Sequence, residues 1–94
     1  MSQEVGVIYV GQKPTTNYVL AAVTQFSQGS KKVVFKARGR AISKAVNAAL
    51  ILKRFLTNRV DIEGVNIGSE KVGEPGKERM VSTIEISVIQ KEEE

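Results

Sequence analysis

The apolar positions in the first third of the chain predict a strand, a helix and a second strand. Residues 5–10 are rich in β-branched side chains and are apolar on both faces, which is typical of a central strand. Proline is favoured in the first turn of a helix, so a helix should begin near Pro14, with Gly29 as its C-cap. Residues 31–37 form the second strand. This order favours a parallel pair joined by a right-handed crossover.

A second helical pattern runs from about Arg40 to Leu56. Its apolar stripe, which ends on a lysine, consists of Ile42, Ala45, Val46, Ala49, Leu50 and Lys53. Arg40, Lys44 and Asn47 lie on another face of this helix. Phe55 falls outside the stripe, and the pattern leaves two alternatives open: Phe55 caps the core, or it is an exposed contact residue.

The last third of the chain predicts two long antiparallel strands. Residues 59–72 form the first, and their apolar positions change parity at residues 63–64, which indicates a β-bulge or a sharp twist. Residues 79–89 alternate between apolar and polar side chains, and the turn-rich segment 73–77 joins the two strands. If pairing extends to the tip, the hairpin projects beyond the body. The charged residues at that tip are Glu70, Lys71, Glu74, Lys77, Glu78 and Arg79.

Composition predicts one globular domain over residues 1–94, with residues 1–4 and 91–94 as flexible ends. Hydrophobic residues make up 41% of the chain and charged residues 26%, which argues against disorder. No apolar run approaches the length of a membrane span, and the N-terminus does not resemble a signal peptide. Without cysteine there is no disulfide framework, and the chain fits the cytoplasm.

The charges are distributed unevenly along the chain. Residues 1–60 carry ten cations and one acid, a net charge of +9, whereas residues 61–94 carry four cations and nine acids, a net charge of −5. The basic part predicts an anionic partner. The alternative is a surface that serves solubility only, but mixed charges would serve solubility equally well.

Four of the cations occur at one strand-to-helix junction: Lys36, Arg38, Arg40 and Lys44. Gly39 between them allows a sharp turn and a close approach of the backbone to a partner. The amides of a first helical turn lack intrahelical acceptors, and the helix dipole adds partial positive charge. The junction therefore predicts phosphate binding, either of a single nucleotide in one nest or of a polyanion across a wider basic surface.

The residue inventory argues against an enzyme and against a bound metal or cofactor. The chain has no histidine and no cysteine, which removes the commonest general base, the thiolate nucleophile and the usual zinc ligands. Asp61 and Glu63 have the spacing of paired carboxylates on one strand face, but a solvated face is the simpler interpretation. Gly39 belongs to no nucleotide-binding glycine motif.

Several segments resemble the Alba family of archaeal chromatin proteins, in register through residues 5–90. They are residues 36–46 (Lys-Ala-Arg-Gly-Arg-Ala-Ile-Ser-Lys-Ala-Val), 11–14 with 17–22, 54–56 and 79–86. The resemblance implies an α+β fold: a two-layer β-α-β-α-β-β sandwich with two helices on one face of a four-stranded mixed sheet. It also implies a homodimer that binds double-stranded DNA without sequence preference, coats and compacts it in the nucleoid, and often binds RNA.

The resemblance also assigns roles to individual residues. It places Gln12, Lys13, Arg38, Arg40 and Lys44 on the nucleic-acid backbone. The hairpin group would be Lys77 and Arg79, which reach along the minor groove. Phe55 matches the position at which one dimer packs against the next along DNA.

Gln12 departs from the family, whose members often carry Lys-Lys before the proline, the first lysine being an acetylation target. Glutamine can hydrogen-bond a phosphate but cannot neutralise it, so we expect weaker binding and no acetyl switch at this position. Three alternatives stay open: RNA as the main ligand, a phosphate- or nucleotide-binding module, and an interaction protein whose basic face meets an acidic partner.

Overall fold

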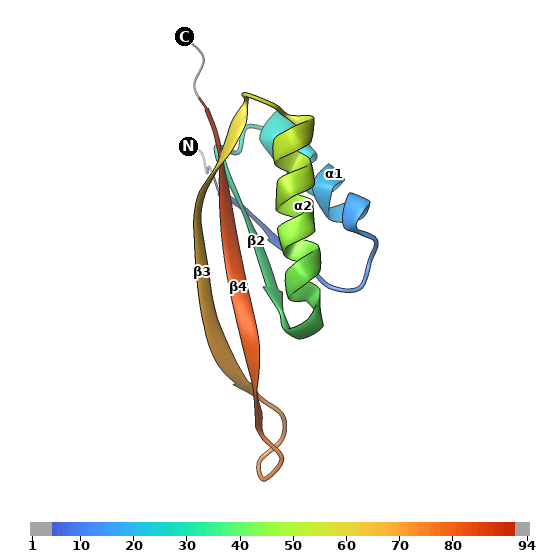
Figure 1. Cartoon of the computed structure of the whole chain (residues 1–94), viewed down its shortest axis with the longest axis vertical. Helices are drawn as coiled ribbons and strands as arrows, with labels where there is room; N and C mark the ends of the chain where they lie inside the picture. Colours follow the sequence, from blue (N-terminus) through green and yellow to red (C-terminus); the bar gives the residue numbers. More distant parts are fainter. Residues whose placement is uncertain (1–4, 92–94) are drawn as a thin grey trace.

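The computed structural model describes residues 5–91 and confirms the expected order of elements. The helices and strands, coloured along the chain in Figure 1, are β1 (Val5–Tyr9), α1 (Thr15–Ser27), β2 (Lys32–Arg38), a short 3-10 helix (Gly39–Ala41), α2 (Ile42–Phe55), β3 (Val60–Val72) and β4 (Arg79–Gln90). Of the ends expected to be flexible, residues 1–4 and 91–94, only Lys91 lies within the described residues, and its backbone N–H donates to the Arg59 carbonyl oxygen at 2.8 Å. Within residues 5–91, no helix is long and apolar enough to cross a membrane.

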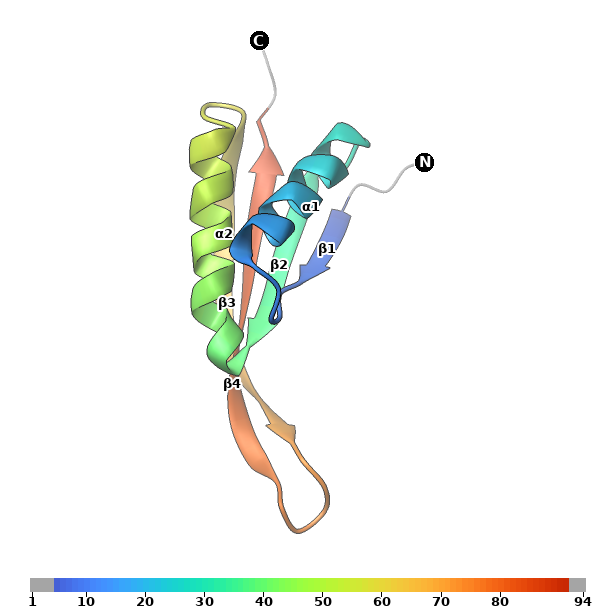
Figure 2. The ribbon, with the colours of Figure 1, turned by 90° about the vertical axis from the view of Figure 1, so that its right-hand side faces the viewer.

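Four strands form one mixed sheet in the order β1-β2-β4-β3, and both helices cover the same face of it (Figure 2). β1 and β2 are parallel, whereas β4 pairs antiparallel with both β2 and β3. The expectation that β1 is a central strand is wrong, because it lies at the edge of the sheet. Its residues alternate between buried and exposed, since no helix or strand within residues 5–91 covers the face of the sheet opposite the helices.

The core lies between the helices and the sheet. The largest fully buried side chains come mostly from the strands: Phe35, Leu52, Val33, Val60 and Val88. The stripe expected on α2 is partly wrong, because the buried positions are Ala45, Ala48, Ala49 and Leu52, whereas Leu50 and Lys53 are exposed. A face centred on alanines allows the helix backbone to pack closely, which leaves the bulkier Leu50 on the surface.

Pairing of β3 and β4 continues to the last residues before the turn, where Val72 faces Arg79. The register shifts between Ile62 and Gly64, which confirms the predicted bulge. The hairpin projects well beyond the helices, as Figure 1 shows, and the described chain measures 55 × 29 × 19 Å along its principal axes.

Candidate nucleic-acid interface

The loop between β1 and α1, which carries Gln12 and Lys13, is held in shape by a tyrosine. Tyr18 is buried on α1, and its hydroxyl oxygen accepts hydrogen bonds from the backbone N–H groups of Gly11 at 2.9 Å and Lys13 at 3.0 Å. The helix itself begins after Pro14, as predicted, and Gly29 follows its C-cap with a φ of +107°. The loop is therefore fixed from the inside of the protein, which leaves the Gln12 and Lys13 side chains exposed.

The same hydroxyl reports a positive electrostatic potential. Burial raises the pKa of Tyr18, but the backbone N–H groups of Gly11 and Lys13 and the charges of Lys44 and Lys13 lower it. The net result is a pKa below the ordinary value of 10.0. The two lysine charges that contribute to this shift come from the loop and from the start of α2, so both add positive potential beside the loop.

The junction between β2 and α2 makes the sharp turn that Gly39 was expected to allow. Arg38 ends β2 in an extended conformation, and Gly39 follows with a φ of +60°, in the left-handed region that favours glycine. No side chain caps the 3-10 helix or α2, and neither first turn carries an acid. The positive end of the α2 dipole therefore has no carboxylate of its own in that turn.

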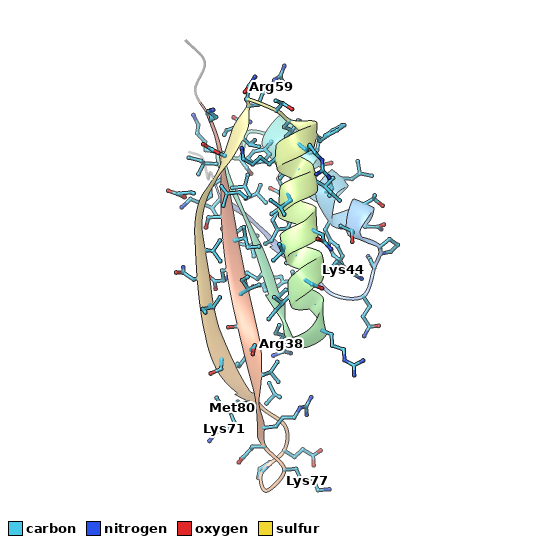
Figure 3. The ribbon with its side chains drawn as sticks, in the orientation of Figure 1. Arg38, Lys44, Arg59, Lys71, Lys77 and Met80 are labelled. Atoms are coloured by element: carbon cyan, nitrogen blue, oxygen red, sulfur yellow. The ribbon has the colours of Figure 1, made fainter. Side chains whose placement is uncertain are left out.

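Four cations from three segments gather at this end of the body, and we call Lys13, Arg38, Arg40 and Lys44 the basic cluster. Arg38, Arg40 and Lys44 line an open hollow of about 480 Å³ together with Gln12. The Lys44 ammonium reaches the loop directly, because its Nζ donates to the Lys13 carbonyl oxygen at 2.7 Å. Figure 3 shows Arg38 and Lys44 toward the end of the body from which the hairpin tip projects.

Arg38 has an internal partner that the sequence did not indicate. Its Nη1 donates to Oε2 of Glu70 on β3 at 3.1 Å, and the two side chains are 59% and 51% exposed. Ion pairs as exposed as this one stabilise a protein by about 0–1 kcal/mol. A phosphate can therefore compete with Glu70 for the guanidinium. Arg40, in contrast, has no acidic partner among the described residues.

Lys36 does not join the basic cluster, which corrects the expectation that four cations meet at the junction. Its ammonium lies 3.5 Å from a carboxylate oxygen of Glu85. These two residues face each other across β2 and β4, on the face of the sheet opposite the helices. Arg38 shares this face of the sheet, but it is the last residue of β2 and lines the hollow with Arg40 and Lys44, whereas Lys36 does not.

The two hairpin cations are in different places. Arg79 lines a hollow of about 380 Å³ with Arg38 and Gly39, so it extends the basic surface from the cluster onto the hairpin. Lys77 lies in the turn at the far tip (Figure 3), and the structure does not bring it to the basic cluster.

Phe55 lies at the other end of α2 from the basic cluster and is 66% exposed. It does not cap the core; Leu56 is the residue that packs against the core there. The contact role of Phe55 stays a prediction.

The carboxylates at Asp61 and Glu63 do not form an acid–base pair. Asp61 lies 3.4 Å from the Lys53 ammonium, and Glu63 lies 3.1 Å from that of Lys32. Across residues 5–91, no group of three or more acidic, histidine or cysteine side chains is arranged to hold a metal ion.

Comparison with known proteins connects this arrangement to one family. The Alba family model matches residues 6–69. The DNA/RNA-binding protein Alba of Nanoarchaeum equitans is 52% identical over 87 residues, covering 89% of this chain and 97% of that protein. Its namesake from Pyrobaculum islandicum is 54% identical over 81 residues, covering 84% and 88%.

A solved structure agrees with these sequence matches. Alba from Thermoplasma volcanium superposes with a TM-score of 0.83 at 40% identity, over 89% of this chain and 99% of that one. The β-α-β-α-β-β order and the four-stranded mixed sheet are thus the fold of these relatives, and the chain belongs to the Alba family.

Proposed function

We propose that this chain coats nucleic acid without regard to sequence, as a homodimer, and compacts chromosomal DNA in the nucleoid. The observation that carries the proposal is the basic cluster, in which three separate segments place four cations at one end of the body. Contacts from Lys and Arg to phosphates position a protein on a duplex but carry no sequence information. The names of the relatives, DNA/RNA-binding proteins, support a nucleic-acid ligand.

Affinity on this proposal comes mainly from the release of counterions by the Lys and Arg side chains. If a dimer neutralises about six phosphates, the logarithm of the binding constant falls with the logarithm of salt concentration with a slope of about −5. Arg79 continues the basic surface onto the hairpin, where a minor-groove contact would add at most a coarse preference for A·T pairs or groove width. Lys77 would contact the nucleic acid at a separate point, near the hairpin tip.

Exposed apolar side chains on the helix-bearing face of the hairpin support the homodimer. Val65 and Ile67 are 53% and 82% exposed, and they lie opposite the buried residues Ile86 and Ile84 in the β3–β4 ladder. Directly opposite residues share a face of the sheet, so this face continues beyond the part that α2 covers. Met80 is 60% exposed and has the same parity on β4 as Ile84 and Ile86, and we call Val65, Ile67 and Met80 the apolar patch. Packing of two such patches would bury it and join two basic clusters in one particle.

Phe55 is proposed to join neighbouring dimers on DNA. It is a large exposed aromatic side chain at the end of α2 remote from the basic cluster, so it stays accessible when the cluster is occupied. Cooperative binding to a long duplex that is lost in Phe55→Ala, with unchanged affinity for a duplex of one site, would support this role. Equal cooperativity in both proteins would contradict it.

The test of the proposed function is a set of binding isotherms on duplexes of several lengths and sequences, repeated across salt. Arg40→Ala and the double variant Arg38→Ala/Arg40→Ala should weaken binding to all sequences and flatten the salt slope by about 0.9 for each phosphate that the variant no longer neutralises. Arg59→Ala is the matched control, because it removes the same charge from the opposite end of the body (Figure 3). Saturable binding of a mononucleotide with indifference to duplex length would instead support a nucleotide-binding module.

RNA is the second candidate ligand, because the related proteins are named for binding both nucleic acids. An A-form duplex presents a wide, shallow minor groove and would meet the basic surface differently from B-DNA. Parallel titrations with duplex DNA and structured RNA at one salt concentration decide between them, and clearly tighter RNA binding would make RNA the main ligand. If neither nucleic acid binds, an acidic protein partner for the basic face becomes the better interpretation.

A further inference from the structure

The face of the sheet opposite the helices carries a hollow that shares only Arg38 with the proposed duplex contacts. Its volume is about 590 Å³, and the residues that matter for its chemistry are Tyr9, Lys36, Arg38, Glu70, Thr83 and Glu85. The hollow thus combines one aromatic ring, two cations, two carboxylates and the hydroxyls of Ser69 and Thr83 on one face of a four-stranded sheet.

Tyr9 is the most distinctive of these residues. It ends β1 and is 74% exposed, while its neighbours Ile8 and Val10 are buried in the core. It pairs in register with Lys36, which in turn faces Glu85, so the three side chains lie in one row across β1, β2 and β4. An exposed aromatic ring beside a cation on an open sheet is an arrangement on which nucleobases stack.

The polar groups around the ring suit the edge of a base better than a phosphate. Glu85 lies 3.5 Å from the Lys36 ammonium and Glu70 accepts from Arg38 at 3.1 Å, so each carboxylate neutralises one cation of the hollow and keeps further lone pairs as acceptors. Carboxylates of this kind accept from the exocyclic amino group of cytosine. Thymine and uracil have no such amino group, so a base with one should be preferred.

Arg38 connects this hollow with the basic cluster, because it lines both. A nucleic-acid strand whose phosphates contact Arg40 and Lys44 would therefore run beside the hollow. Paired bases inside a duplex are stacked and cannot enter the hollow. An unpaired base can turn out of its strand and enter it.

We propose that the hollow at Tyr9 is a second nucleic-acid site that takes one unpaired base, stacked on the tyrosine ring with its amino edge on Glu85 or Glu70. This inference rests on the proposed function, since the basic cluster supplies the phosphate contacts. The site would let the protein distinguish single-stranded from double-stranded nucleic acid, which phosphate contacts alone cannot do. Only a single-stranded segment has an unpaired base that can bind in the hollow.

The first experiment compares Tyr9 variants on a 20-nucleotide oligodeoxycytidylate and on a duplex of the same length. Stacking of one base contributes enough that Tyr9→Ala should weaken single-strand binding about 5- to 10-fold, whereas Tyr9→Phe, which keeps the ring, should bind like wild type. Duplex affinity should be the same in all three proteins. Leu20→Ala is the control, because it truncates another exposed apolar side chain, on α1. Unchanged single-strand binding by Tyr9→Ala, or equal weakening on both nucleic acids, would overturn the proposal.

A second variant keeps the test decisive if Tyr9→Ala folds poorly. The chain has no tryptophan, so Tyr9→Trp places the only indole of the protein in the hollow. Its fluorescence should be quenched by oligodeoxycytidylate, less by oligothymidylate, and not by the duplex. Equal quenching by single strand and duplex would contradict a site for unpaired bases.

Failure of this proposal can be told apart from failure of the proposed function. If Arg40→Ala weakens binding to both nucleic acids while the Tyr9 variants behave like wild type, only the base site is wrong. If wild-type protein binds neither nucleic acid, both proposals fail.

Discussion

The guanidinium of Arg38 at the end of β2 donates to the carboxylate of Glu70 on the hairpin at 3.1 Å, so one cation of the basic cluster has an anionic partner within the protein. The two residues are separated by β4 in the order of the sheet. On the proposed function, a phosphate that binds Arg38 would compete with Glu70 for the guanidinium.

Replacing this internal anion should tighten binding. Glu70→Gln keeps the size of the side chain but removes its charge, and since exposed pairs are worth about 0–1 kcal/mol, we expect duplex affinity to rise by up to about fivefold at low salt. The measurement is a fluorescence-anisotropy titration. Glu63→Gln, which releases Lys32 away from the cluster, is the control and should change affinity less. Unchanged or weaker binding by Glu70→Gln would contradict the competition between Glu70 and the nucleic acid for Arg38.

The Tyr18 hydroxyl is predicted to position the loop that carries Lys13. Tyr18→Phe keeps the ring in the core but leaves the N–H groups of Gly11 and Lys13 without their acceptor, so the loop should open more often. We expect faster hydrogen exchange at these two amides and duplex binding weakened by a few-fold, about 1 kcal/mol. Exchange rates equal to those of wild type would contradict this role. Amides in the middle of α2 serve as the internal control.

The lowered pKa of Tyr18 predicts a pH dependence of known sign. The folded state binds the phenol proton less tightly than the unfolded state does, so folding gains stability as pH rises from the folded pKa toward 10.0. The free energy of unfolding of wild type minus that of Tyr18→Phe should therefore increase across this range and level off above it. Urea unfolding at several alkaline pH values measures the difference. A difference that falls with pH would show that burial outweighs the hydrogen bonds.

Gln12→Lys restores a cation beside Lys13 on the rim of the basic cluster. Duplex binding should become tighter, and the salt slope should steepen by about 0.9 for each phosphate newly neutralised. Gln28→Lys, at the opposite end of α1, adds the same charge remote from the cluster and should leave the slope nearly unchanged. If Gln12→Lys binds no more tightly than wild type at fixed salt, Gln12 lies outside the interface.

Ile67→Glu tests the homodimer, because it places a charge in the centre of the apolar patch. Ile67 is 82% exposed within one chain, so the variant should fold, but the dimer would have to bury two carboxylates. Sedimentation velocity should show a dimer for wild type, a monomer for Ile67→Glu, and a dimer for the control Leu20→Glu on α1. Dimers of all three proteins would place the interface elsewhere.

Features that depend on neighbouring residues could be predicted from the sequence. The change of parity at residues 63–64 indicated the bulge because the side chains of a strand alternate with a period of two. Gly39 indicated the turn because few other residues adopt its φ of +60°. The helix after Pro14 and the projecting hairpin followed from equally local signals.

Features that depend on the order of the strands could not be predicted in this way. β1 is apolar at consecutive positions, which predicted a central strand, but it is the first strand in the sheet order and one of its faces is exposed. Arg38 and Glu70 are 32 positions apart in the chain. They can pair because β2 and β3 both lie beside β4. Lys36 was grouped with the junction for the same reason, since the sequence does not show that Glu85 faces it.

The assembly of the basic cluster from a loop, a strand end and a helix start links ligand affinity to folding. The unfolded chain has the same cations but not their shared geometry, so nucleic acid bound preferentially to the folded form must raise its stability, by about 2.7 kcal/mol when the free ligand exceeds its dissociation constant a hundredfold. The melting temperature of the protein then depends on whether nucleic acid is bound. Protein that has dissociated from the nucleic acid should unfold at a lower temperature than the complex.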